Sequence, residues 1–259
     1  MMSTRLKTSV VARSLLLQSC WNYQGMQNVG FAFALQPWLR SIERGGGPSA
    51  AESTKRHLEF FNTQPYMASF VLGVTGRLEE ERAAAPPHAR EQVAQRISRL
   101  KAAFGSALAG VGDSLFWGTL RPACAAFGMC LWLLTYTLGA DDPFLWAALG
   151  YLLSYNVPAL ALRWRGLALG YGLGEGLAGE LKRFNWQERM RKIRWAGLGL
   201  AVLLTMAALL VPPWAPAASW WNVLAIAAAL GIRRLGYPTP RVFTASLGLF
   251  VLAAAAGVL

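Results

Sequence analysis

The sequence contains little charge, and little of the charge it has is acidic. Charged residues make up 15% of the 259 residues, whereas they make up about a quarter of an ordinary soluble domain. There are 13 acidic and 25 basic residues, so the net charge is +12. Since 54% of the residues are hydrophobic, the shortage of charge indicates an integral membrane protein. No basic run stands in a motif that reads bases, so we expect no nucleic-acid partner.

Cysteine and histidine are also scarce, which excludes several kinds of site. The cysteines Cys20, Cys124 and Cys130 form no CxxC pair and have no histidine nearby, so neither a disulfide framework nor a zinc site is expected. The two histidines are His57 and His88, and the sequence has no Walker A, dinucleotide-binding or HExxH motif. We therefore predict no catalytic residue, no metal, no cofactor and no enzymatic activity in this chain.

Long uncharged stretches dominate the sequence after Gly118. No Asp, Glu, Lys or Arg occurs in Pro122–Gly139, Pro143–Leu162, Trp195–Ile232 or Val242–Leu259. A membrane span needs roughly 17 to 25 predominantly apolar residues. The longest stretch is divided by prolines in its middle, so these stretches predict about four or five spans.

The basic residues around the longest stretch predict its orientation. Lys182–Arg194 precedes it, and Arg233, Arg234 and Arg241 follow it. Loops rich in Lys and Arg stay in the cytoplasm. We therefore expect both flanks in the cytoplasm and the proline-rich turn Pro212–Pro216 outside.

Residues 1–118 are amphipathic rather than uniformly apolar. A helical stripe is formed by Val93, Ile97, Leu100, Phe104 and Leu108, which predicts a helix lying in the membrane interface or packing on its own protein. Breaks are expected around Pro65 and at Gly110–Asp113. The predicted fold is an all-α integral membrane protein, with several transmembrane helices plus broken or re-entrant and amphipathic helices. Residues 1–118 and 119–259 would form one integrated membrane domain.

Three polar clusters stand where apolar residues would be expected: Ser19–Asn28, Arg56–Tyr66 and Gly110–Thr119. Each mixes aromatic rings with amides or carboxylates. This mixture suits a sugar, because carboxylates and amides bind pairs of hydroxyls while a ring covers the apolar face of the pyranose. Polar groups at membrane depth are costly and tend to be functional. The same residues could instead cap and terminate half-helices, and both interpretations stay open.

The candidate substrate-binding residues come from all three clusters. They are Asn22, Gln27, His57, Glu59, Asn62, Gln64, Asp113 and Trp117. We expect the side chains of His57, Glu59, Asn62, Asp113 and Trp117 to approach one polar cavity that is shared with a partner subunit.

The same clusters carry a family resemblance. The motifs are QSCWNY at Gln18–Tyr23, KRHLEFFNTQP at Lys55–Pro65 and GVGDSLFWGT at Gly110–Thr119, and Arg121-Pro122 and Gly170–Gly172 also fit. From about Arg13 to Gly174 the chain resembles the IID component of the mannose/fructose/sorbose phosphotransferase family.

Some positions depart from the family pattern. Gln24-Gly25 replaces the usual charged pair, Ala107 replaces a usual proline, and Ala159, which follows Pro158, replaces a usual arginine. These changes leave a second function open, a membrane scaffold or sensor derived from IID that does not transport sugar.

The resemblance implies a set of partners and a location. Family members associate with a IIC membrane subunit, and the IIC–IID pairs form trimers in the bacterial inner membrane. Sugar binds between core segments of both subunits and crosses by an elevator-type movement, while phosphate reaches it from a histidine of the cytoplasmic IIB protein. The cytoplasmic IIA protein is a further expected partner. This chain would thus be a multi-pass permease subunit that contacts the lipid bilayer, binds a hexose-type sugar and carries no phosphoryl group.

Overall fold

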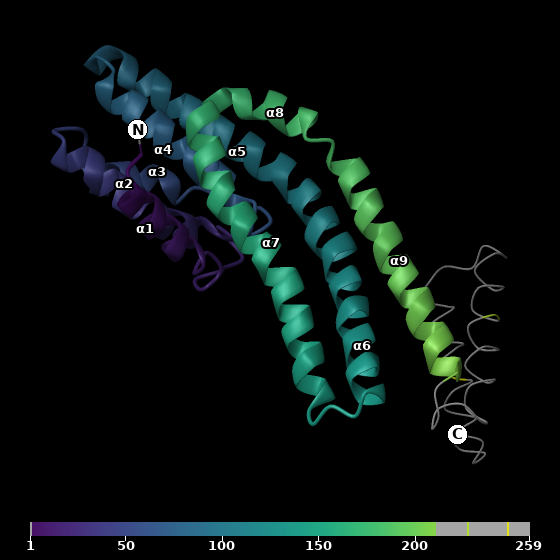
Figure 1. Cartoon of the computed structure of the whole chain (residues 1–259). Helices are drawn as coiled ribbons and strands as arrows, with labels where there is room; N and C mark the ends of the chain where they lie inside the picture. Colours follow the sequence, from purple (N-terminus) through teal and green to yellow (C-terminus); the bar gives the residue numbers. More distant parts are fainter. Residues whose placement is uncertain (1, 211–226, 228–247, 249–259) are drawn as a thin grey trace.

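The computed structural model describes residues 2–210 together with Ala227 and Gly248 (Figure 1). Every regular element in residues 2–210 is helical, and strand-like pairing there is limited to two isolated bridges, Asn22–Met26 and Met26–Phe61. The prediction of an all-helical chain is confirmed for these residues. The predicted turn Pro212–Pro216 and the stretch Val242–Leu259 lie outside the described residues.

The first part of the chain folds into a helical body. Its helices are α1 (Thr4–Ser14), α2 (Asn28–Arg44), α3 (Ala50–His57), α4 (Ala68–Ala84) and, after the 3-10 turn η1 (Pro87–Ala89), the first half of α5 (Arg90–Leu115). Helix α4 is the centre of this body, because its residues from Ala68 to Gly76 are all buried. A helix that is apolar on all sides has to be covered on all sides.

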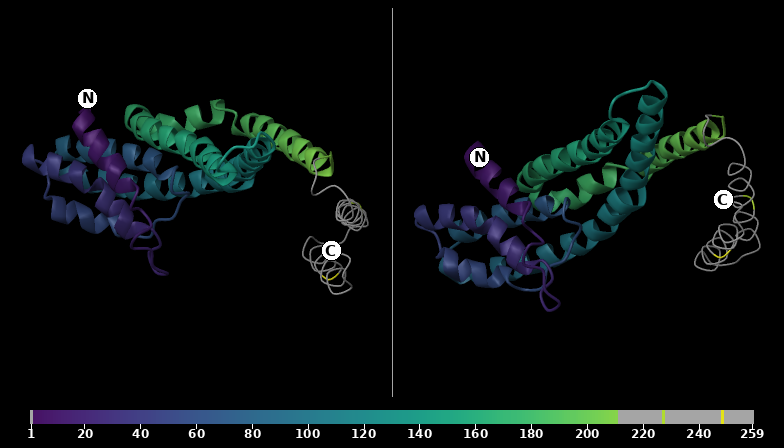
Figure 2. Two further views of the ribbon diagram at one scale, coloured as in Figure 1. Left: turned by 60° about the horizontal axis from the view of Figure 1, so that its bottom comes forward. Right: turned by 90° about the horizontal axis from the view of Figure 1, so that it is seen from below.

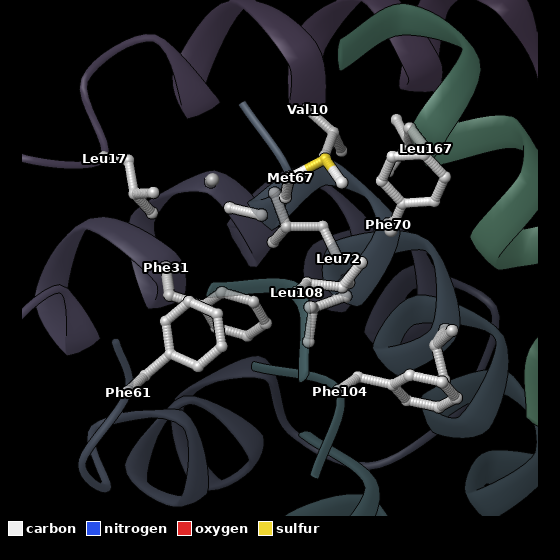
Figure 3. Close-up of a cluster of buried hydrophobic side chains, with 14 of the residues drawn as sticks. Val10, Leu17, Phe31, Phe61, Met67, Phe70, Leu72, Phe104, Leu108 and Leu167 are labelled. Atoms are coloured by element: carbon white, nitrogen blue, oxygen red, sulfur yellow. The ribbon is translucent and has the colours of Figure 1, made fainter. Parts of the chain in front are cut away.

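The core joins this body to a helix much later in the sequence. Figure 3 shows Val10, Phe31, Met67 and Leu108 in one cluster with Leu167, which belongs to α7 (Pro143–Leu173). Each of these five side chains is at most 1% exposed. The stripe predicted on α5 is confirmed as a core face, since Ile97, Phe104 and Leu108 are buried.

The remaining helices extend away from the body as an arm. Helix α5 continues through a π-helical turn η2 (Phe116–Leu120) into α6 (Arg121–Thr137); α7 returns, and η3 (Gly174–Gly176) and α8 (Leu177–Arg183) lead to α9 (Trp186–Leu210). Both views in Figure 2 show α6, α7 and α9 reaching away from α1–α4. Helix α7 starts sharply because Asp142 accepts a hydrogen bond from the Leu145 backbone N–H at 3.0 Å and Pro143 takes the first helical position.

The arm exposes large apolar side chains along its length. Exposed examples on α7 are Leu153, Val157 and Leu160, and on α9 Leu203. Among the described residues, one helix, Pro143–Arg183, is long and apolar enough to cross a membrane, and most of its apolar window is uncovered by the protein. Large apolar patches of this kind mark contact with lipid or with another protein.

Glycines allow α4 and α7 to touch backbone to backbone. A Cβ on Gly170 would lie 2.1 Å from the Phe70 carbonyl oxygen, and one on Gly73 would lie 2.3 Å from the Leu167 carbonyl oxygen. No larger residue fits this contact without moving a helix. Gly170 therefore has a packing reason to be glycine, which the sequence alone did not reveal.

One predicted helix break is right and the other is wrong. The chain leaves helical geometry between His57 and Ala68, around Pro65. Gly110–Asp113 instead lies inside α5, which runs unbroken to Leu115. A glycine in a helix costs only about 1 kcal/mol, which a long packed helix tolerates, and Gly112 is needed there for a close contact with Gln64.

Candidate functional site

The non-helical segment 58–67 lies along one face of α5. Glu59 accepts a hydrogen bond from the Ser98 hydroxyl at 2.9 Å. Further along, Phe61 packs on Gly105 and Gln64 packs on Gly112. Gly105 and Gly112 are two helical turns apart and share a face, so on this face of α5 the segment can pack close to the helix backbone.

Gln27 fixes this segment from the other side. Its side-chain Nε2 donates to the Thr63 carbonyl at 2.8 Å, and the Thr63 backbone N–H donates to Gln27 Oε1 at 3.1 Å. The Gln27 backbone N–H also donates to the Phe61 carbonyl at 2.8 Å. Gln27 is buried, so it holds the first and second polar clusters together.

Asn22 and Gln64 also satisfy local backbone groups. Asn22 Oδ1 accepts from the Gly25 backbone N–H at 2.7 Å, which closes a tight turn. Gln64 Oε1 accepts from the backbone N–H groups of Tyr66 and Met67 at 2.8 and 3.2 Å, where α4 begins. The Gln64 Nε2 group is buried and has no partner in the described part of the chain. Its N–H donors are therefore available to a bound ligand or a partner protein.

His57 lies inside the body and faces Glu79. Its side chain is 0% exposed, and Nε2 lies 2.9 Å from Glu79 Oε1. Burial lowers the pKa of His57, although Glu79 opposes this effect. Burial alone would raise the pKa of Glu79, but the hydrogen bonds and charges of His57 and Arg56 outweigh it and lower that pKa.

Arg56, Arg82 and Lys101 complete this buried network. Arg56 donates to both Glu79 oxygens at 2.9 and 3.1 Å, and Arg82 lies 4.0 Å from the second oxygen. Lys101 is 2% exposed, and burial lowers its pKa to about 8. Sequence reasoning missed Glu79, because it stands in a charged stretch that resembles a solvated helix end.

Four candidate side chains are exposed. Glu59 and Asn62 are exposed on the segment itself, Asp113 is exposed near the end of α5, and Trp117 is exposed on η2. Glu59 borders a hollow of about 570 Å³ that Arg56, Ser98 and Arg99 also line. The structure thus separates the five residues expected at one cavity, since His57 faces the interior while the other four face outward.

Near these residues, the third polar cluster meets the start of α9. Arg194 Nε donates to the Thr119 hydroxyl at 3.0 Å. Ser114 borders a hollow of about 780 Å³ lined also by Asn185, Gln187, Glu188, Met190, Arg191, Arg194, Trp195 and Leu198. The guanidinium carbon of Arg121 lies over the Trp117 ring, 5.4 Å from the ring centroid. Within the described residues, no group of three or more His, Cys, Asp or Glu could hold a metal ion.

Comparison with known proteins gives the family. The profile described as PTS system mannose/fructose/sorbose family IID component matches residues 2–216. The PTS system mannose-specific EIID component of Escherichia coli strain K12 is 39% identical over 165 residues, which cover 64% of this chain and 54% of that protein. The PTS system sorbose-specific EIID component of Klebsiella pneumoniae is 35% identical over 173 residues, covering 67% of this chain and 58% of that one. The aligned region thus spans little more than half the length of these relatives.

Two solved structures of membrane proteins have a similar fold. A cryo-EM structure of the mannose transporter ManYZ in complex with a microcin contains a chain that is 26% identical, with a TM-score of 0.56, covering 100% of this chain and 98% of that one. A second structure, described as a membrane protein, is 26% identical with a TM-score of 0.66, covering 98% of this chain and 97% of that chain. The fold, the three polar motifs and the match over residues 2–216 show that this chain belongs to the mannose/fructose/sorbose family of PTS IID components.

Proposed function

We propose that this chain is the IID subunit of a sugar permease in the bacterial inner membrane. Together with a IIC subunit it would bind a hexose-type sugar and carry it across the membrane, while the cytoplasmic IIA and IIB proteins supply the phosphate. The chain itself would perform no chemistry. The observation that carries the proposal is that Glu59 and Asn62 are exposed on a segment that Gln27 and Ser98 hold by hydrogen bonds, while Asp113 and Trp117 are exposed further along α5 and η2.

Four candidate residues have a supporting role in this proposal. Gln27 and Gln64 hold the segment that presents Asn62 and Glu59, His57 anchors the end of α3 just before it, and Asn22 closes a nearby turn. A binding site needs such support, because side chains bind precisely only when their own positions are fixed. Direct sugar contact by Asn22, Gln27 or Gln64 would add to this structural role.

An exposed apolar cluster supports the need for a IIC partner. Trp21, Tyr23, Leu58 and Phe60 are all exposed, and Asn28 ties the two loops together by donating to the Leu58 carbonyl at 2.6 Å. Exposed aromatic clusters of this kind are typical of protein interfaces. IIC would cover this cluster and close the open side of the sugar site, and IIC–IID pairs would assemble as trimers.

The charge distribution supports the proposed topology. The connection between α6 and α7 carries Asp141 and Asp142 and no Lys or Arg. The opposite end of the arm carries the basic run Lys182–Arg194, and in Figure 1 this end lies on the same side as the N-terminus. The positive-inside rule then puts Lys182–Arg194 in the cytoplasm.

Co-expression with a candidate IIC subunit tests the proposal. We expect the two proteins to copurify and the pair to bind sugar, whereas either protein alone would not. Failure to copurify, or copurification without sugar binding or uptake, would favour the alternative of a scaffold or sensor. This alternative rests on the family resemblance at Ala159, where that family usually carries an arginine, and Ala159 is fully buried here.

A further inference from the structure

The helix pair α1–α2 carries a basic groove that the proposed function does not use. The groove has a volume of about 630 Å³, and arginine side chains dominate its lining. The charged lining residues are Arg5, Arg13, Arg40, Arg44 and Glu43. Ser3, Ser9 and Ser41 add hydroxyl groups, which donate hydrogen bonds to anionic oxygens.

These arginines differ from four others in the body, on α3, α4 and α5. Arg56, Arg77, Arg82 and Arg96 each form an ion pair with a glutamate. By contrast, none of the groove's four guanidiniums forms an ion pair with a carboxylate in the described part of the chain. The groove's single acid, Glu43, accepts a hydrogen bond from the Ala50 backbone N–H at 3.2 Å instead. Four clustered cations without counter-ions form a site that favours an anion.

A proline fixes one of these arginines in place. Pro37 lies inside α2 and has no N–H, so the Phe33 carbonyl loses its helical partner. The Arg13 Nη1 group donates to that carbonyl at 3.4 Å, and its guanidinium carbon lies 4.6 Å from the Phe33 ring centroid. Arg13 is therefore held at the point where the basic groove meets an apolar surface.

The same helix pair is apolar at its other end. Leu16, Val29 and Phe33 are exposed there, and α1 and α2 are in close contact, because a Cβ on Gly30 would lie 2.0 Å from the Leu17 carbonyl oxygen. One surface of the pair thus changes from arginine to aliphatic and aromatic side chains along its length. A phospholipid has the same polarity, with an anionic phosphate at one end and acyl chains at the other.

We propose that the α1–α2 groove binds an anionic phospholipid. The phosphate of the headgroup lies among Arg5, Arg40 and Arg44, since arginine binds phosphate oxygens with paired N–H groups. The acyl chains lie along Phe33 and Val29. Basic pockets on the cytoplasmic side of membrane proteins bind headgroups by this chemistry.

Native mass spectrometry of the purified full chain, with added phosphatidylglycerol or phosphatidylcholine, tests the proposal. The wild-type protein should retain phosphatidylglycerol preferentially. Arg40→Gln/Arg44→Gln should weaken that retention by about tenfold or more, because each basic residue near an anionic headgroup contributes a factor of roughly five. The control Lys182→Gln/Arg183→Gln removes the same charge at exposed positions on α8 and should keep the preference.

Two further measurements separate a lipid site from a site for free phosphate. Phe33→Ser should weaken retention of phosphatidylglycerol while leaving any binding of inorganic phosphate unchanged, since Phe33 is exposed and offers an apolar ring to the proposed acyl chains. Equal retention of both lipids by the wild type would overturn the proposal, as would equal losses in the two double variants. Binding of inorganic phosphate without any preference for phosphatidylglycerol would also overturn it.

Discussion

The body and the arm of this molecule differ in how far they bury their large apolar side chains. The body encloses its large apolar side chains, such as Trp38 and Phe31, and also encloses charges, which it pairs around Glu79. The arm leaves large apolar side chains such as Leu153 and Leu203 uncovered. The body therefore has an interior core, to which α7 contributes Leu167, whereas the exposed apolar face of the arm requires lipid or a partner helix. The following predictions test this difference, starting with the largest expected effect.

Removing the acid at the centre of the body should have the largest effect. Glu79→Ala leaves Arg56 and Arg82 without their buried partner, and loss of one partner of a buried ion pair costs about 3–5 kcal/mol. We expect aggregation or a large drop in unfolding temperature in detergent. Glu81→Ala is the control, because Glu81 is 39% exposed and exposed pairs contribute about 1 kcal/mol at most. Equal unfolding temperatures for both variants would contradict the buried network.

A charge placed on the arm should be costly although the position is exposed. Leu153 is 60% exposed, so Leu153→Arg would be harmless if water surrounded α7. In lipid the same change costs roughly 2.5–3.5 kcal/mol, and we expect less protein in the membrane fraction. Ala84→Arg, at an exposed position at the end of α4 in the body, should leave membrane levels unchanged. Normal membrane levels of Leu153→Arg would reject lipid contact at this position.

The contact between body and arm can be broken with one methyl group. Gly170→Ala would place a Cβ 2.1 Å from the Phe70 carbonyl oxygen of α4, and overpacking of this kind costs about 1–3 kcal/mol. Gly172→Ala lies on the same helix with nothing within 4 Å of its Cβ, so it should be neutral or slightly stabilising. The unfolding temperatures of the two variants in one detergent give the comparison. If Gly170→Ala matches Gly172→Ala, the two helices do not touch as described.

Acid should destabilise the body gradually. The pKa of His57 is lowered from 6.5, so the fold favours the neutral ring, and this contribution is lost as the pH falls below about 6.5. The pKa of Glu79 is lowered from 4.5, so its contribution is lost at still lower pH. Both groups act in the same direction, and the unfolding temperature should fall as the pH is lowered from 7 towards 4. His88→Gln should show the same pH dependence, because His88 is exposed. A flat profile for the wild type would contradict the buried pair.

Sequence reasoning found the features that follow from local chemistry. Uncharged stretches gave α6 and α7, the periodic stripe gave the buried face of α5, and Pro65 marked the break before α4. It could not find Glu79, because a buried ion pair depends on which helices meet. It misplaced a break at Gly110–Asp113 for the same reason, since Gly112 there serves a contact between distant segments. Asn22 and Gln64 bond neighbouring backbone groups, and Gln27 bonds Thr63 in a distant segment. The Gln27 contact depends on the fold, so the sequence could not predict it, and sugar contact by these three residues stays a prediction.

Sugar uptake by the assembled permease tests the central claim most directly. In cells that also make the IIC, IIA and IIB proteins, Asn62→Ala and Asp113→Ala should each lower uptake by about tenfold, because loss of hydrogen bonds to a buried ligand costs about 1–3 kcal/mol. Both side chains are exposed in this chain, so protein level and copurification with IIC should stay unchanged. Asp141→Ala, in the connection between α6 and α7, should transport like the wild type. Wild-type uptake by both the Asn62 and the Asp113 variants would contradict the proposed sugar site.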